Sequence, residues 1–190
     1  MKADASIEFL REFHGDALWV LVAIHPDRSK NICITRTFLQ GEEAKARIFI
    51  DRWNGTYNLY FLIAEPKGVP TKKPRKTDIL RTFYFWVDVD PRTGEDLDEE
   101  RERIRRLCTS NLPEGVPEPT FVVDSGRGYW CFWRLVDPVV IDGDLDLARN
   151  AELYNIELER RFGADSCHNI DRIARLPGTL NMKTKEFSIV

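Results

Sequence analysis

Two aspartates close the apolar run FYFWVDVDP, at positions where their side chains could bind a metal ion. Side chains alternate across a β-strand, so Asp88 and Asp90 should share one face while Val87 and Val89 point to the other. Two carboxylates on one face of a strand repel each other unless cations neutralise them. Hard divalent cations such as Mg²⁺ prefer carboxylate and phosphate oxygens. The pair therefore indicates a metal site, and the alternative is an acidic pair that only leads into the polar turn PRTGED.

A second stretch, VVDSGRGYWCFWRL, predicts a hairpin with Gly126, Arg127 and Gly128 at its tip. Glycines allow positive φ and a close approach of the backbone to a ligand, which suits phosphate oxygens. Arg127 would add a forked donor to the same oxygens. An ordinary hairpin turn is the alternative, because hairpins commonly use glycine pairs.

A third stretch, CHNIDRIARLPGTLNMK, contains Asp171, Arg172 and Arg175. If the chain returns to the sheet here, Asp171 could become a third oxygen ligand and Arg175 could reach a triphosphate. Metal and polyphosphate charge would then be neutralised from opposite sides. The alternative is a surface ion pair between Asp171 and a neighbouring arginine, which contributes little to stability.

The stretch TKKPRKTDILR, residues 71–81, carries five cations against one acid and follows neither a helical nor a strand period. The stretch predicts a basic loop that contains Lys72, Lys73, Arg75 and Lys76. A solvated surface loop is the alternative, since charge runs are usually solvated.

Composition limits the possible classes of protein. The chain has 190 residues, 43% of them apolar and 31% charged, which is typical of a globular protein. A net charge of −3 argues against indiscriminate coating of nucleic acid. No apolar stretch reaches the roughly 20 residues that a membrane span needs, so we expect a cytoplasmic protein without a membrane partner. Four separated cysteines without a CxxC pair, and only three histidines, argue against a zinc site.

Hydrophobic periodicity predicts an α+β fold in two halves. The first half, residues 1–65, should be an α/β module, and a basic connecting loop over 66–81 should lead to a second module over 82–190. The elements expected in the first half are a helix containing Ile7, Leu10 and Phe13, strands over 18–24, 32–38 and 57–65, and a helix over 42–53. Those expected in the second half are strands over 82–90, 120–124, 129–136 and 185–190 and helices over 97–108 and 145–162. The second order, β-α-β-β-α-β, is that of an RRM-like or ferredoxin-like module.

In this order and spacing, FWVDVDP, SGRGYWCFWRL and NIDRIARLPGTLNMK resemble the motifs of the archaeo-eukaryotic primase (AEP) superfamily, and specifically the primase-polymerase domains of plasmids and phages. The resemblance implies a catalytic domain that joins an N-terminal α/β module to an RRM-like module, with the active site between them. By position, Asp88, Asp90 and Asp171 would be the catalytic metal ligands, holding two Mg²⁺ or Mn²⁺ ions. Ser125, Gly126, Arg127 and Gly128 would line the triphosphate pocket, assisted by Arg172 or Arg175. Many relatives have a histidine at the position of Trp130, where it contacts the incoming nucleotide; a tryptophan supplies one neutral donor and no cation.

The resemblance implies template-directed nucleotidyl transfer, as DNA primase, DNA polymerase or both, with DNA and nucleoside triphosphates as partners. With DNA as a partner, Lys72, Lys73, Arg75 and Lys76 of the basic loop become the candidates for contact with the template backbone. No GxxxxGK[ST] motif occurs, so a helicase would have to lie outside this sequence. The end at FSIV, within an expected strand, suggests a longer chain. Two other functions compete with this interpretation: a non-catalytic replication initiator module that binds nucleic acid, and a metal-dependent nuclease that uses the same acids.

Overall fold

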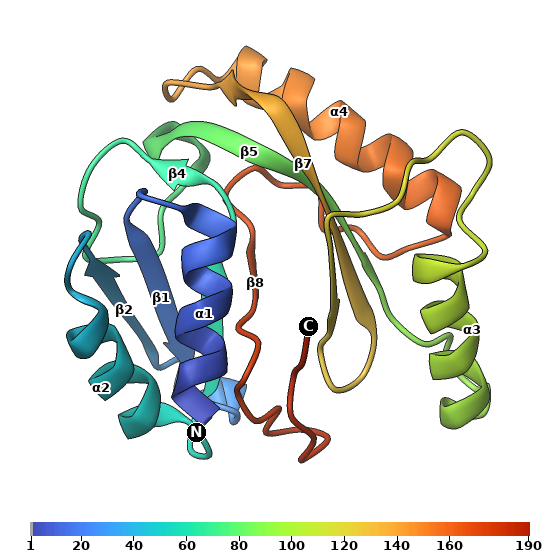
Figure 1. Ribbon diagram of the computed structural model, residues 1–190, viewed down its shortest axis with the longest axis horizontal. Helices are drawn as coiled ribbons and strands as arrows, with labels where there is room; N and C mark the ends of the chain where they lie inside the picture. Colours follow the sequence, from blue (N-terminus) through green and yellow to red (C-terminus); the bar gives the residue numbers. More distant parts are fainter. Residues whose placement is uncertain (1) are drawn as a thin grey trace.

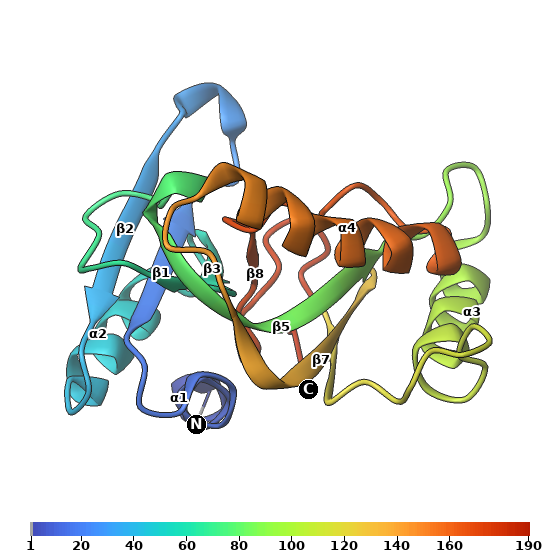
Figure 2. The same cartoon turned by 90° about the horizontal axis from the view of Figure 1, so that it is seen from above.

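The computed structural model describes residues 2–190 and confirms the α+β class, with two antiparallel sheets side by side (Figures 1 and 2). The first half of the chain forms α1 (Lys2–His14), β1 (Trp19–Ile24), η1 (Arg28–Lys30), β2 (Cys33–Phe38), α2 (Glu43–Trp53), β3 (Asn58–Leu62) and β4 (Glu65–Pro66). The second half forms η2 (Lys76–Asp78), β5 (Ile79–Val89), α3 (Leu97–Thr109), β6 (Phe121–Asp124), β7 (Tyr129–Val140), α4 (Leu145–Phe162) and β8 (Ile173–Arg175). Within the described residues, no helix is long and apolar enough to cross a lipid bilayer.

The first sheet has the strand order β2-β1-β3-β8, and the second has the order β4-β5-β7-β6. The two long strands of the second sheet, β5 and β7, pair along most of their length. Helices α3 and α4 lie on the side of this sheet away from the first sheet (Figure 2). The strand that carries Asp88 therefore has helices on one side and the N-terminal half on the other.

Alternation along β5 follows the prediction. Val87 and Val89 pack with Ile104 of α3 and Phe162 of α4 in one apolar cluster. Tyr84 and Trp86 belong to the other cluster, which includes α1 and the first sheet. The ring of Tyr84 stacks on that of Phe13 with centroids 4.0 Å apart. Asp88 and Asp90 continue the face of Tyr84 and Trp86, toward the first sheet.

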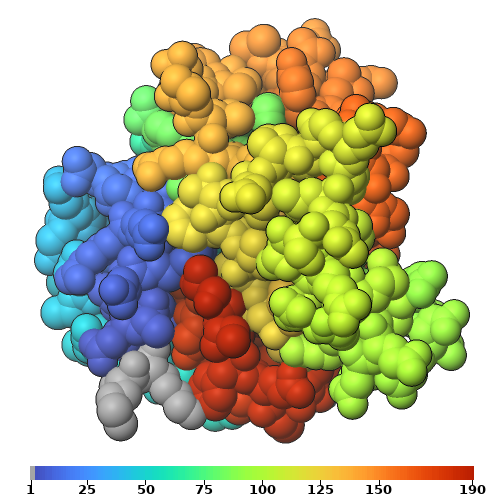
Figure 3. All heavy atoms as spheres, turned by 45° about the vertical axis from the view of Figure 1, so that its right-hand side comes forward, coloured from blue at the N-terminus to red at the C-terminus, as the bar shows by residue number. Residues whose placement is uncertain are grey.

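The predicted final strand over 185–190 is wrong. In its place, residues near the C-terminus make only isolated bridges, Leu180 with Phe187 and Asp124 with Ile189. The returning strand is instead β8, and it pairs with β3 of the first sheet rather than with the second. In Figure 3, the C-terminal residues (red) lie between the N-terminal helix (blue) and the yellow-green residues of the second half. The C-terminal residues thus lie between the two halves of the chain.

Candidate active site

A cleft of about 570 Å³ lies where the two sheets meet. Residues from three parts of the chain line it: Pro26, Arg28, Asn58 and Tyr60 from the first sheet and its β1–β2 connection; Asp88, Asp90, Ser125, Arg127 and Trp130 from the second sheet; and Arg175, Asn181, Met182 and Lys183 from β8 and the segment after it. The structure thereby brings together two of the three predicted acids, the glycine hairpin with Trp130, and two of the three predicted arginines, Arg127 and Arg175.

The carboxylates of Asp88 and Asp90 are half-buried in this cleft and have no side-chain hydrogen bond or ion pair within residues 2–190. Burial raises the pKa of Asp88 well above its usual range; the charges of Asp90 and Asp165 raise it further, and Arg172 and Arg175 oppose the shift. Burial also raises the pKa of Asp90, and the charge of Asp165 raises it further. The positive charges of Arg127, Lys183 and Arg175 oppose this shift. Such oxygen ligands without a partner cation fit a hard divalent ion.

The hairpin between β6 and β7 packs directly against the acids. The Ser125 amide donates to the Gly128 carbonyl over 2.9 Å, and the Ser125 hydroxyl lies 3.0 Å from the same carbonyl. A Cβ on Gly128 would lie 2.3 Å from the Val89 carbonyl oxygen and 2.7 Å from Asp90 Oδ1. Gly126 has φ of +82°, which disfavours a side chain. Both glycines are therefore needed for the hairpin to lie against the end of β5.

Arg127 and Arg175 supply positive charge to the cleft in different ways. Arg127 makes no ion pair in the described chain, and its Nε is buried without a hydrogen-bond partner. Arg175 is 9% exposed and donates to Asn58 Oδ1 over 3.0 Å and to the Tyr60 hydroxyl over 3.1 Å. Burial lowers the pKa of Arg175, although Tyr60 and the two acids favour its charge. Arg127 is thus a cation with unused donor capacity beside the acids.

Arg172 does not line the cleft. Its guanidinium donates to the Ser166 carbonyl over 2.6 Å and to the Cys167 carbonyl over 3.0 Å. The side chain predicted to bind nucleotide therefore holds a backbone segment in this structure, and only its charge acts on Asp88.

The structure does not bring Asp171 to Asp88 and Asp90, so the expected cluster of three carboxylates is not formed. Asp171 pairs with Lys73 over 3.0 Å and does not line the cleft. It lies two residues ahead of Ile173, which pairs with Leu62, whereas the cleft lies beyond Tyr60 and Asn58 at the opposite end of β3. No group of three potential metal ligands exists among residues 2–190. A catalytic role of Asp171 stays a prediction.

Two of the four predicted cations of the basic loop form ion pairs with carboxylates of the same chain. Lys73 pairs with Asp171, and Lys76 pairs with Glu152 over 2.7 Å. Lys72 and Arg75 are exposed, have no ion pair in the described chain and line a second groove of about 740 Å³ along the loop. They are the loop cations that remain available to a polyanion.

Several cleft residues were missed in the sequence. Arg28 lies in the turn PDRSKN, which contains no recognisable binding motif. Asn58 and Tyr60 alternate in YNLYFLIAE, so their common face could have been recognised as the polar face of a strand. Asp165, whose charge acts on both acids, lies in a loop whose position depends on the whole fold.

Comparisons with known proteins agree on the fold. The AEP domain of the primase-polymerase of cyanophage S-2L superposes with a TM-score of 0.68 at 19% identity, covering 98% of this chain and 87% of that chain. The catalytic domain of the primase RepB′, solved in complex with initiator DNA, superposes with a TM-score of 0.60 at 16% identity, covering 100% of this chain and 84% of that chain. The fold is therefore that of an AEP primase domain, as the motifs predicted.

Among curated proteins, a replication protein of Clostridium perfringens is 34% identical over an alignment of 155 residues that covers 73% of this chain. The match spans only 37% of the length of that protein. No family model matches the sequence.

Proposed function

We propose that this chain catalyses template-directed nucleotidyl transfer, as a DNA primase, a DNA polymerase or both, in replication of the plasmid or phage type. The observation that carries the proposal is the position of Asp88 and Asp90, unpaired and half-buried, beside a glycine hairpin whose Arg127 has unused donors. Carboxylates that face a phosphate group need a cation between the carboxylate and the phosphate oxygens. Two acids beside a glycine hairpin and an arginine, in an AEP fold, therefore suit the binding of a nucleoside triphosphate.

In this proposal, Asp88 and Asp90 hold Mg²⁺ or Mn²⁺. An ion held there would supply the positive charge that lowers the pKa of an attacking hydroxyl and neutralises a leaving pyrophosphate. Arg127 and Lys183, whose charges already act on Asp90, bind the triphosphate beside the acids. Arg175, fixed by Asn58 and Tyr60, keeps its guanidinium facing the acids and limits their mutual repulsion.

Trp130 forms the wall next to Asp88 and provides a flat apolar surface and one N–H donor. In the proposed complex it orients the nucleotide by contact, since it cannot offer the positive charge of a histidine. Arg127 then supplies the charge that the resemblance assigns to that position.

DNA as template and primer is supported by RepB′, whose catalytic domain was solved with initiator DNA. Lys72 and Arg75 are the proposed backbone contacts, because Lys73 and Lys76 are already paired with carboxylates. A helicase domain or protein is proposed as a partner outside this sequence.

A direct test incubates the protein with a labelled primer-template, nucleotides and Mg²⁺ or Mn²⁺. Longer products support the proposal, shorter products indicate a nuclease, and a gel shift alone indicates a binding module. Asp88→Asn serves as the catalytic control, and it should bind DNA but form no product. Omitting the primer separates strand initiation from extension.

A further inference from the structure

One edge of β5 has no neighbouring strand along the part that leads to the acids. On one side, β5 pairs with β7 from Arg81 to Val89. On the other side, β4 pairs only with Arg81 and Ile79. Buried backbone amides without a partner are costly, so the amides on this open edge need other acceptors.

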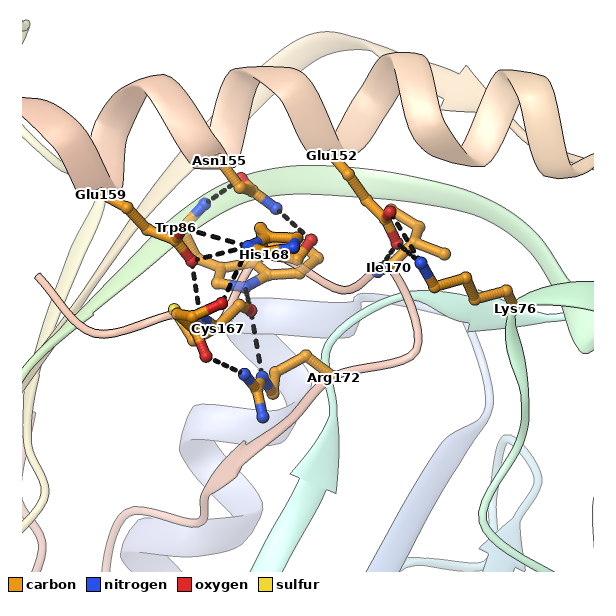
Figure 4. A network of polar contacts seen from close by, with 10 residues as sticks. Lys76, Trp86, Glu152, Asn155, Glu159, Cys167, His168, Ile170 and Arg172 are labelled. Carbon is orange, nitrogen blue, oxygen red and sulfur yellow. Dashed lines mark hydrogen bonds and ion pairs between the residues drawn. The ribbon is translucent and has the colours of Figure 1, made fainter.

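The side chain of Asn155 in α4 takes the place of a strand at this edge (Figure 4). Its Oδ1 accepts a hydrogen bond from the Trp86 amide over 2.9 Å, and its Nδ2 donates to the His168 carbonyl over 3.3 Å. Asn155 is 0% exposed, so both of its polar groups are used inside the protein. The residue thereby joins β5, two positions before Asp88, to the segment 166–170.

The segment 166–170 is itself fixed from both sides. The Trp86 indole donates to the Cys167 carbonyl over 2.9 Å, and Arg172 donates to the same carbonyl over 3.0 Å. Glu159 of α4 accepts from the Cys167 amide and lies 3.0 Å from His168 Nδ1 (Figure 4). The Cys167 thiol also lies against β5: burial raises its pKa, the charge of Asp88 raises it further, and a hydrogen bond with the Asp88 backbone opposes the shift.

We propose that Asn155 is a positioning residue for the Asp88–Asp90 pair, acting through the Trp86 backbone and the segment 166–170. The inference deepens the proposed function and rests on it for the role of the two acids. A buried amide costs stability unless its hydrogen bonds are made, and an apolar residue of similar size would fill the space. Two repelling carboxylates at the end of a strand with one open edge need such an anchor, because a displaced strand would separate the ligands.

The test compares Asn155→Leu, which keeps the volume, and Asn155→Ala with the matched control Glu152→Gln. Glu152 lies one turn earlier on α4, accepts a hydrogen bond from the Ile170 amide over 2.9 Å and pairs with Lys76 (Figure 4). Glutamine at this position keeps an acceptor for the Ile170 amide, so the control removes only the charge that faces Lys76 and leaves the anchoring of the segment 166–170 in place. Two measurements are made without nucleotide: Mn²⁺ binding by electron paramagnetic resonance, and hydrogen exchange of the Trp86 and Asp88 amides.

In the folded Asn155 variants, Mn²⁺ affinity should fall by about 10-fold or more, which is typical of lost partners behind metal ligands. Exchange at Trp86 and Asp88 should accelerate, and Glu152→Gln should keep both wild-type values. A folded Asn155→Leu with wild-type Mn²⁺ affinity and exchange overturns the proposal. If the variants do not fold, hydrogen exchange of the wild type decides. Fast exchange of the Trp86 and Asp88 amides overturns the proposal, and slow exchange supports it. A wild type without polymerase activity would refute the proposed function, while the exchange data would still decide the role of Asn155.

Discussion

Asp88 and Trp130 lie directly opposite each other in the antiparallel pairing of β5 and β7. Trp130 is 6% exposed, and its ring stacks on that of Phe132 with centroids 5.8 Å apart and planes 10° apart. Directly opposite residues of an antiparallel pair share a face of the sheet and lie close together. The indole N–H has no hydrogen bond within residues 2–190, so packing sets the orientation of this ring beside the carboxylate.

Replacing Trp130 with phenylalanine should raise the KM for nucleotide while changing the melting temperature little. The aromatic ring keeps its stacking on Phe132, but the only polar donor of the side chain is lost. Trp130→Ala should additionally unfold at lower temperature, because truncating a buried tryptophan costs about 3–5 kcal/mol. Steady-state incorporation and thermal melting measure the two effects. Unchanged nucleotide KM in Trp130→Phe would show that the N–H has no contact with the substrate.

Asp88→Asn should melt at a higher temperature than the wild type in metal-free buffer at neutral pH. The folded-state pKa of Asp88 is raised, so the folded protein keeps this proton to higher pH than the unfolded chain. Stability from this group is therefore highest at acid pH and is lost as pH rises through the raised pKa. Above that pH the buried charge destabilises the fold, and the neutral amide removes this penalty.

The same variant should lose the stabilisation that Mg²⁺ gives the wild type, because a ligand that binds only the folded state raises its melting temperature. Melting curves with and without Mg²⁺ measure both effects. Asp137→Asn, at an exposed position of β7, is the matched control and should behave as wild type. If Asp88→Asn melts lower than wild type without metal, the burial argument fails.

The sequence predicted those parts of the site that depend on local patterns. Alternation in FYFWVDVD put Asp88 and Asp90 on one face, and the glycines of SGRG allowed the hairpin to approach them. Pairing between strands far apart in the sequence could not be predicted in this way. FSIV has the apolar character of a strand, but the strand that returns to the sheet is formed within RIAR and pairs with β3.

The same limit explains Arg172 and Asp171. The motif predicts that the guanidinium of Arg172 contacts phosphate. In the structure, this guanidinium instead donates to the backbone carbonyls of Ser166 and Cys167. Asp171 was expected beside the other acids, yet the basic loop crosses to it and Lys73 neutralises it. Both contacts depend on how loops far apart in the sequence come together. Such contacts leave no periodic pattern in the sequence, so they could not be predicted from it.

Asp171→Asn should weaken Mn²⁺ binding far less than Asp90→Asn. Asp171 faces Lys73 and not the cleft, so removing its charge leaves the carboxylate pair intact. Asp165→Asn should lower the pKa values of Asp88 and Asp90, because the charge of Asp165 now raises both. The pH dependence of Mn²⁺ binding measures each effect. Complete loss of Mn²⁺ binding in Asp171→Asn would restore the three-carboxylate site that the motifs predicted.

The double variant Lys72→Ala/Arg75→Ala should weaken DNA binding and reduce its dependence on salt. Each phosphate contact with single-stranded DNA contributes a slope of about −0.7 to log K against log salt, so the slope should become less negative by about 1.4. Lys73→Ala/Lys76→Ala should change the slope less, since both lysines are paired with carboxylates. Fluorescence anisotropy over a salt series measures the slopes, with Lys45→Ala in α2 as control. Equal slopes for both double variants would contradict this division of the loop.

The wild type should lose stability as the pH falls from 6.5 toward 4, and His14→Phe should lose less. Burial lowers the pKa of His14 from 6.5 to about 4, and a hydrogen bond with the Leu62 backbone opposes this only in part. Its Nε2 is buried without a partner, and its ring contacts those of Phe13 and Phe61. The unfolded chain therefore binds a proton at higher pH than the folded protein, so the stability present above pH 6.5 declines through this window. The decline from this group should be of order 2–3 kcal/mol. Urea unfolding at pH 7.5 and pH 4.5 measures it, and an equal decline in wild type and His14→Phe would assign the acid sensitivity to other groups.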